Sequence, residues 1–268
     1  MDVEIGLGEV FLREVASIRN IALIVTFTGL VFLSTSIFFI AIPTSSGFFN
    51  IGEVFVYLAA LIGGPITGAI AGGAGASLAD VALGYGYFAP GTAVIKFIEG
   101  FLVGLIFHYS RKLQKWIRYL FMLILCGLLI GFSAFYSNQE FVFGMEFYGK
   151  KTLEGTVPGY VFLIISLVLT IIVVLVLIFL KEKGEMALAC IGGGAFMVLG
   201  YFIYEIGILS YPVGAGASEI PFNIAQVVLS AAIVIPIVSY LGELGILKRY
   251  SKEDLIEDEK SVEKESVD

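Results

Sequence analysis

Six ionisable residues stand inside apolar stretches of the sequence. They are Glu53, Asp80, Lys96, Glu99, Glu205 and Glu219. Inserting such a group at the centre of a membrane helix costs roughly 2.5 to 3.5 kcal/mol, so by default it indicates a functional site. The neutral amides of Asn50, Asn223 and Gln226 stand close to them in the sequence. Together these groups could hold a small polar solute through ion pairs and hydrogen bonds.

The overall composition indicates the surroundings of these residues. The chain of 268 residues is 58% hydrophobic and 15% charged, with a mean hydropathy of +0.96, a balance that calls for lipid as the main solvent. Acidic residues concentrate near the C-terminus, and we expect residues 244–268 to form a disordered tail. Cys126 and Cys190 stand in apolar runs without other ligand-type residues at metal spacing. We therefore expect no disulfide, metal site or cofactor.

Apolar runs of about 20 residues predict the membrane helices, because a hydrocarbon core of about 30 Å needs that length in helical form. Six such runs cover about 20–42, 90–108, 116–136, 157–180, 186–209 and 220–242. Residues 51–83 would be about 50 Å long as a single helix, but Gly63-Gly64-Pro65 interrupts them. We expect two shorter helices there, and hence an all-α polytopic membrane protein of about eight helices.

The positions of Lys and Arg predict the orientation of these helices, since short cytoplasmic loops are enriched in both. With a break at Gly64, the basic residues of 13–19, 111–118, 181–183 and 248–252 fall on one side, and only Lys150 and Lys151 fall on the other. A single pass over 51–83 would divide the basic groups between the two sides. We therefore expect a plasma membrane protein whose segment 1–19 and both termini are cytoplasmic. The first apolar run lacks a convincing cleavage site and should remain as a membrane helix.

This orientation brings all six ionisable residues towards the outer leaflet, which indicates a polar pocket open to the outside. An alternative is that Lys96 and Glu99, three residues apart on one helical face, simply neutralise each other, while the outermost carboxylates reach interfacial water. Aromatic residues at 48–49 and 85–88 stand in the outer loops. They fit an interfacial belt at least as well as stacking on a ligand.

Small residues recur every four positions in the glycine ladder, which consists of Gly64, Gly68, Gly72 and Ala76. Such a face lets another helix backbone approach closely. The ladder fits packing within the chain and docking of a separate membrane subunit equally well.

Several segments follow a common pattern. They are 50–61, beginning Asn50-Ile51-Gly52-Glu53, then Gly64-Pro65 with the ladder to Ala79-Asp80, 85–90, Ile95-Lys96-Phe97-Ile98-Glu99-Gly100, 200–205 and Glu219-Ile220-Pro221-Phe222-Asn223. Together they resemble the substrate-binding S component of energy-coupling factor (ECF) transporters, in particular its riboflavin-type branch. The resemblance covers roughly 20–110 and 186–242.

The resemblance implies a membrane subunit that binds riboflavin or another vitamin from outside and works with a transmembrane coupling (T) subunit and two ABC-type ATPase subunits. S components generally have six helices, which implies a core of 20–111 and 184–243 and an inserted helix pair with an outer loop at 112–183. By position, the substrate-binding residues would be Asn50, Glu53, Lys96, Glu99, Glu205, Glu219 and Asn223. The partner-docking residues would be Gly64, Gly68, Gly72 and Ala76.

Two other classes of protein fit parts of the pattern. An intramembrane aspartyl protease needs two facing aspartates, but Asp80 is the only intramembrane aspartate. A serine protease needs a histidine base, but His108 lies at the end of its helix on the cytoplasmic side, away from the other polar residues. We do not expect an enzyme. A self-sufficient secondary transporter also uses buried carboxylates and broken helices, but the break at Gly64 falls at a cytoplasmic turn. The sequence has no G-x-x-x-x-G-K-[ST] loop, so ATP-driven uptake would need its motor on another chain.

Overall fold

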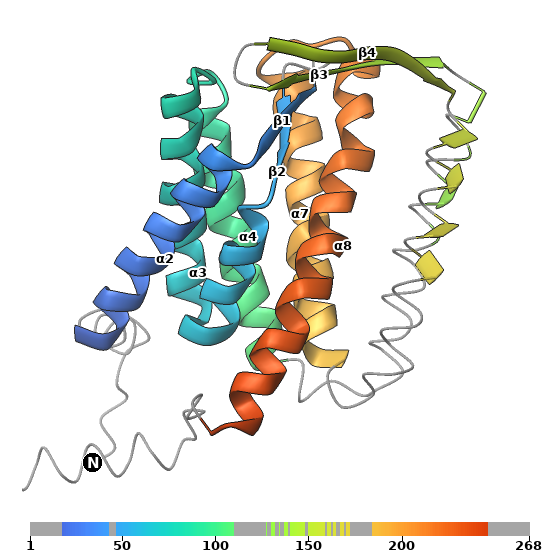
Figure 1. The fold of residues 1–268 in the computed structure, drawn as a ribbon. Helices are drawn as coiled ribbons and strands as arrows, with labels where there is room; N and C mark the ends of the chain where they lie inside the picture. The colour runs from blue at the N-terminus through green and yellow to red at the C-terminus, as the bar shows by residue number, and fades with distance from the viewer. Residues whose placement is uncertain are drawn as a thin grey trace, which may run out of the picture.

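A computed structural model describes residues 18–42, 47–109 and 184–245, together with two strands and scattered positions between 127 and 171. In chain order the elements are α2 (Ile18–Ile37), β1 (Phe39–Ile42), β2 (Gly47–Asn50), α3 (Glu53–Leu83), α4 (Ala89–Tyr109), β3 (Glu140–Phe147), β4 (Lys150–Pro158), α7 (Gly184–Gly207) and α8 (Val213–Glu243). The helices form one bundle (Figure 1). The predicted N-terminal segment, inserted helix pair and acidic tail lie largely outside the described residues.

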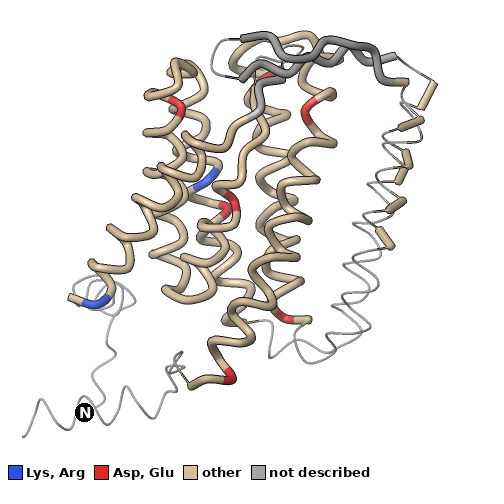
Figure 2. Tube along the Cα trace, in the orientation of Figure 1, with Lys and Arg blue, Asp and Glu red and all other residues tan. Residues whose placement is uncertain are grey.

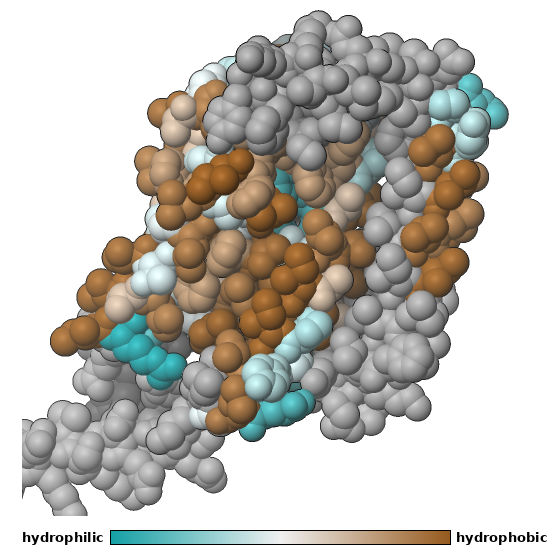
Figure 3. Space-filling model, viewed as in Figure 1, coloured by the Kyte–Doolittle hydropathy of each residue, from teal (hydrophilic) through white to brown (hydrophobic). Residues whose placement is uncertain are grey.

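The helices of this bundle have the surface of membrane helices. Within the described part of the chain, five helices, namely α2, α3, α4, α7 and α8, are long and apolar enough to cross a membrane. Large apolar side chains such as Val25, Val94 and Ile203 are more than half exposed, and apolar residues cover most of the bundle surface that is coloured in Figure 3. Such a surface is stable against hydrocarbon rather than water. The protein is therefore a polytopic membrane protein.

Helix α3 consists of two arms, residues 53–63 and 65–83, joined at Gly64. The Gly64 backbone has φ 83° and ψ −177°, a combination that is essentially restricted to glycine. Pro65 follows as the first residue of the second arm, where a missing N–H costs no helical hydrogen bond. The predicted interruption of this segment is confirmed.

The two arms of α3 run antiparallel, because residues at equal distances from Gly64 are neighbours. A Cβ built on Gly68 would lie 2.8 Å from the Cα of Ala60, and a Cβ built on Gly72 would lie 3.1 Å from Cγ1 of Val56. The second arm, 65–83, is the longer one and therefore runs back along the first arm and beyond its start.

The glycine ladder is used inside the chain. A Cβ on Gly72 would lie 2.8 Å from the backbone oxygen of Lys96, and a Cβ on Gly68 would lie 2.8 Å from the backbone oxygen of Gly100. Ala76 is also buried. Packing against α4 and against the first arm of α3 therefore accounts for Gly68 and Gly72, while docking of a separate subunit on this face stays a prediction. Gly64 forms the turn between the arms.

Two β-hairpins accompany the helices, which the all-α prediction did not include. The first predicted helix ends at Ile37 instead of 42, and β1 pairs with β2 in the register Phe39↔Asn50 to Ile42↔Gly47. A short run of Phe and Ile residues suits a strand as well as a helix, and Pro43 disfavours continuation of the helix. In Figure 1 this hairpin reaches into the bundle, and the β3–β4 hairpin crosses the same end. The start of α2 and the end of α8 lie at the opposite end (Figure 1).

Helix α8 begins at Val213, one and a half to two turns before the predicted start at 220. Pro221 lies inside this helix and not at its first turn, because the helix already starts at Val213, directly after Pro212. Glu219 therefore belongs to the interior of α8. This shift places its side chain against the neighbouring elements of the bundle instead of at a helix end.

Candidate functional site

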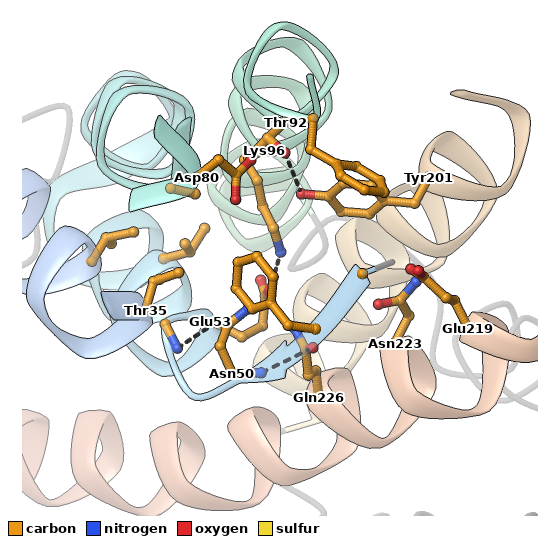
Figure 4. Close-up of a pocket in the computed structure, with 17 residues that line it drawn as sticks. Thr35, Asn50, Glu53, Asp80, Thr92, Lys96, Tyr201, Glu219, Asn223 and Gln226 are labelled. Carbon is orange, nitrogen blue, oxygen red and sulfur yellow. Dashed lines mark hydrogen bonds and ion pairs between the residues drawn. The ribbon is translucent and has the colours of Figure 1, made fainter. Parts of the chain in front are cut away.

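A small cavity lies beside strand β2, where six elements of the bundle meet. Its volume is about 40 Å³, which suffices for a few water molecules. The polar and charged residues that line it are Thr35, Asn50, Glu53, Asp80, Thr92, Lys96, Tyr201, Glu219, Asn223 and Gln226, and the others are Val31, Gly47, Phe48, Gly52, Val56, Ala76 and Phe88. Figure 4 shows most of the polar side chains pointing towards one another. Charged residues are otherwise sparse along the helices, and acidic and basic positions meet inside the bundle (Figure 2).

Lys96 is the central charged group of the cavity wall. Its ammonium forms an ion pair with the Glu53 carboxylate and a second one with Glu99 Oε2 at 3.0 Å. All three residues are at least 95% buried. Lys96 Nζ also lies 5.8 Å from the centre of the Tyr201 ring, within the range of a cation–π contact. The three charges thus form a closed ionic group with one more carboxylate than ammonium.

Glu99 does not line the cavity, because Lys96 stands between its carboxylate and the cavity in this ionic group. The hydroxyl of Tyr57 donates a hydrogen bond to Glu99 Oε1 at 3.3 Å. Tyr57 is fully buried in the first arm of α3. Glu99 is therefore placed to orient Lys96, and its contact with α3 is made through Tyr57 as well as through the lysine.

Three amide side chains complete another part of the wall. Asn50 Oδ1 accepts a hydrogen bond from the backbone N–H of Gly52 at 2.8 Å, and the backbone N–H of Asn50 donates to Gln226 Oε1 at 3.3 Å. Because both side-chain oxygens are engaged, the amide nitrogens of Asn50 and Gln226 are the donors that these side chains can offer. Asn223, three residues before Gln226 on α8, is buried and lines the same cavity.

Asp80, Thr92 and Tyr201 lie on a further side of the cavity (Figure 4). The Tyr201 hydroxyl and the Thr92 hydroxyl are hydrogen-bonded at 3.2 Å. Asp80 comes from the second arm of α3 and is only 3% exposed. Its Oδ2 has no hydrogen-bond partner among the described residues.

A second pair of carboxylates lies where α7 meets α8. Glu219 lines the cavity next to Gly47 of β2, whose missing side chain leaves the room for the carboxylate. Glu205 is fully buried in the last turns of α7 and does not line the cavity. A Cβ on Gly216, three residues before Glu219, would lie 3.1 Å from Glu205 Oε2. Glu205 therefore packs directly behind the part of α8 that carries Glu219.

Aromatic rings close the remaining sides of the cavity. Phe48, Phe88 and Tyr201 line it. The ring of Phe48 lies 4.9 Å from that of Tyr85, and the rings of Tyr87 and Phe88 lie 5.1 Å apart. The aromatic residues of 48–49 and 85–88 thus continue into the cavity wall, and only Phe48 and Phe88 among them line the cavity itself.

The structure brings together most of the residues predicted from the sequence. Five predicted site residues line the cavity: Asn50, Glu53, Lys96, Glu219 and Asn223. Glu99 and Glu205 lie behind the wall. The prediction missed Asp80 as a site residue, and it missed the hydroxyl groups of Thr35, Thr92 and Tyr201. One signal was present in the sequence, because Thr92 stands four residues before Lys96 on the same helical face.

A comparison with known protein families agrees with this arrangement. Residues 15–153, slightly more than half of the chain, match the model of the family described as "ECF-type riboflavin transporter, S component". The chain belongs to this family, which is a family of membrane transporter components and not of enzymes. The match extends into 112–153, so the assignment of 112–183 as an insertion stays a prediction.

A curated relative from Pyrococcus woesei is 38% identical over 98 residues and is named "Uncharacterized protein in gap 3'region". The matched part makes up 37% of this chain and 64% of that protein. The chain thus covers somewhat less than two thirds of the relative's length, and the relative's name assigns no activity.

Proposed function

We propose that this protein is the substrate-binding membrane subunit of an ATP-driven, ECF-type importer, and that it captures a vitamin-type solute, with riboflavin as the candidate, in the cavity beside β2. The observation that carries the proposal is the convergence of buried polar side chains from α2, β2, α3, α4, α7 and α8 on one cavity. Intramembrane polar groups are costly to bury. Their concentration in one place favours a binding site over scattered packing roles.

The composition of the cavity wall suits a planar heteroaromatic solute. Phe48, Phe88 and Tyr201 offer ring faces and edges, while Asn50 and Gln226 offer amide donors. Sites for small organic molecules commonly combine apolar contacts with a few well-placed polar groups in this way.

Binding a vitamin requires the cavity to enlarge. Its volume of about 40 Å³ is far below the several hundred Å³ of sites for such ligands. Strand β2 contributes Gly47, Phe48 and Asn50 to the wall. We propose that a displacement of these residues provides the required volume while the helix packing is kept.

The remaining parts of the proposal follow the family. A T subunit and two ABC-type ATPase subunits would drive release of the solute on the cytoplasmic side. The cavity would face outwards and both termini would be cytoplasmic, in the plasma membrane. The start of α2 and the end of α8 lie at the same end of the bundle, away from the β-hairpins (Figure 1), which supports placing both termini on one side of the membrane. Residues 112–183 would form an added helix pair and 244–268 an acidic tail.

Equilibrium binding tests the proposal directly. The purified full chain in mild detergent is titrated into riboflavin while the flavin fluorescence is followed. We expect saturable quenching at micromolar or lower concentration, and competition by unlabelled solute in a membrane-bound assay. If riboflavin shows no saturable binding even at a 100-fold higher concentration, which corresponds to a binding free energy about 2.7 kcal/mol weaker, it is excluded as the solute.

Transport by reconstituted protein separates this proposal from the alternative of a self-sufficient secondary transporter. The chain alone in proteoliposomes should bind solute without accumulating it. Uptake should require ATP together with the T subunit and ATPases that co-purify with the chain from its native membrane. Accumulation driven by an ion gradient without these partners would favour the secondary transporter.

The orientation can be tested with single cysteines in a variant lacking Cys126 and Cys190. Ser210→Cys lies in the exposed turn between α7 and α8, and Leu244→Cys follows α8 at the other end of the bundle. A membrane-impermeant thiol reagent applied to intact cells should label the first position only. The reverse pattern would place the cavity on the cytoplasmic side.

A further inference from the structure

The ionic groups of the cavity are unequal in number. Among the described residues, the lining contains the carboxylates of Glu53, Asp80 and Glu219 but a single ammonium, that of Lys96. This ammonium is already in contact with Glu53 and, on its buried side, with Glu99. An anionic solute would therefore meet a lysine whose charge is balanced by two carboxylates.

Asp80 differs from Glu53 in its surroundings. Glu53 forms an ion pair with Lys96, whereas no ion pair involves Asp80 among the described residues. Asp80 is 97% buried, lines the cavity, and has an Oδ2 atom without a hydrogen-bond partner in the described part of the chain. A buried polar atom of this kind is costly unless a partner satisfies it. A donor on the bound solute would supply that partner.

We propose that Asp80 determines the charge selectivity of the cavity, so that it accepts a neutral or cationic solute with a hydrogen-bond donor facing Asp80 and rejects solutes that carry a phosphate or carboxylate. This inference rests on the proposed function of the cavity and names the chemical class of its solute. Asn50 and Gln226 supply donors to acceptor atoms elsewhere on the solute. The rings of Phe48 and Phe88 are compatible with a neutral or positively charged ring system.

The physical basis of the selectivity is repulsion at low dielectric. An anion placed beside a buried carboxylate that forms no ion pair is repelled, because like charges interact more strongly at low dielectric than in water. For the same reason a donor that approaches the carboxylate forms a charge-assisted hydrogen bond, which is stronger than a neutral one. The repulsion of anions and the stronger hydrogen bond to a donor both favour a neutral or cationic solute.

The experiment compares two probes that differ by one phosphate, riboflavin and riboflavin 5′-phosphate. Each is titrated with the purified full chain, and the ratio of their dissociation constants is measured. We expect the phosphorylated probe to bind about 100-fold more weakly or worse. Equal affinity for the two probes would overturn the inference while leaving the proposed function intact.

The substitution Asp80→Asn tests the role of the residue itself, since it keeps the size and removes the charge. The ratio of dissociation constants should shrink at least tenfold, mainly through tighter binding of the phosphorylated probe. Glu185→Gln, which removes the same charge at the start of α7, is the matched control and should leave the ratio unchanged. An unchanged ratio in folded Asp80→Asn protein would show that Asp80 does not determine the selectivity. If that variant does not fold, the inference is tested by the ratio measured for the unsubstituted chain, and equal affinity for the two probes overturns it.

A second pair of probes, thiamine and thiamine monophosphate, separates the inference from the identity of the solute. If this pair binds and the flavins do not, riboflavin is the wrong candidate, and the same preference for the form without phosphate is expected. Preferred binding of the phosphorylated form in either pair contradicts the inference. Absence of binding for all four probes counts against the proposed function and, with it, against the inference.

Discussion

The ammonium of Lys96 forms an ion pair with the carboxylate of Glu53, a residue 43 positions earlier in the chain. This contact ties α4 to the first arm of α3 at the level of the cavity. Both groups are almost completely buried, so each depends on the other for compensation of its charge. The pair therefore connects the stability of the bundle with the charge distribution of the site.

Removal of Lys96 should destabilise the protein through the carboxylates that it leaves behind. We expect Lys96→Met to lower the free energy of unfolding by about 3 to 5 kcal/mol, because breaking a buried ion pair leaves an uncompensated charge. Thermal unfolding in detergent measures the effect. The double variant Lys96→Met/Glu53→Gln should recover part of the loss, and strictly additive effects would show that the two residues do not interact. Arg19→Met, exposed at the start of α2, is the control for charge removal.

Substitution of Asn223 should weaken solute binding without unfolding the protein. Asn223→Ala removes a buried amide from the cavity wall, and the loss of one hydrogen bond to the solute corresponds to about a tenfold weaker affinity. Ser230→Ala, buried on the same helix but away from the cavity, should leave the affinity unchanged. Equal affinity in both variants would exclude Asn223 from contact with the solute.

Glu99→Gln should act differently from Asn223→Ala, because Glu99 lies behind Lys96 and does not line the cavity. The substitution removes one of the two carboxylates that hold the lysine, so it should reduce both thermal stability and affinity. Tyr57→Phe removes the hydrogen bond to Glu99 and should shift stability in the same direction by about 1 kcal/mol. Reduced affinity with unchanged stability in Glu99→Gln would indicate direct contact with the solute.

The close packing of α4 on the second arm of α3 should be sensitive to added volume. In Gly72→Ala the new Cβ would lie 2.8 Å from the backbone oxygen of Lys96, so α4 must shift, at a cost of about 1 to 3 kcal/mol. Gly29→Ala on α2, where nothing lies within 4 Å of the new Cβ, should be neutral or stabilising by up to about 1 kcal/mol. Unfolding of the two variants under identical conditions gives the comparison, and similar stabilities would argue against the tight contact.

The turn within α3 should tolerate no residue other than glycine at position 64. Both Gly64→Ala and Gly64→Asn should cost about 1 to 3 kcal/mol, because the backbone conformation there is open to glycine alone. At Gly84, which has φ 88° and ψ 6° at the end of α3, asparagine should cost less than alanine because it tolerates the left-handed region. Neither glycine has atoms within 4 Å of an added Cβ, so unfolding measurements on these four variants report backbone strain without steric overlap.

The positions of Gly64 and of the charged residues could be predicted from the sequence for physical reasons. The Gly63-Gly64-Pro65 interruption and the distribution of basic residues both require a reversal of α3, and the structure has it. The cost of burying Glu53, Lys96 and Glu219 likewise marks them as unusual wherever they lie.

Other features could not be predicted, because the sequence signal has more than one interpretation. The run Phe39–Ile42 is as apolar as the helix before it, so its strand conformation becomes evident only from its pairing with β2. Burial cost alone does not distinguish a carboxylate that lines a cavity from one that lies behind a lysine, so the sequence predicts Glu99 as a site residue although it does not line the cavity. Thr92 and Tyr201 carry no charge and therefore give no comparable signal.

The short first arm of α3 has a consequence for transport in the proposed orientation. At 1.5 Å per residue, residues 53–63 rise about 16 Å, roughly half of the hydrocarbon thickness. With the cavity facing outwards, a solute held beside Glu53, at the start of this arm, would lie about halfway through the bilayer. Release on the cytoplasmic side would then require a path through about 16 Å of protein, the length of the first arm down to the turn at Gly64, and not through the full membrane.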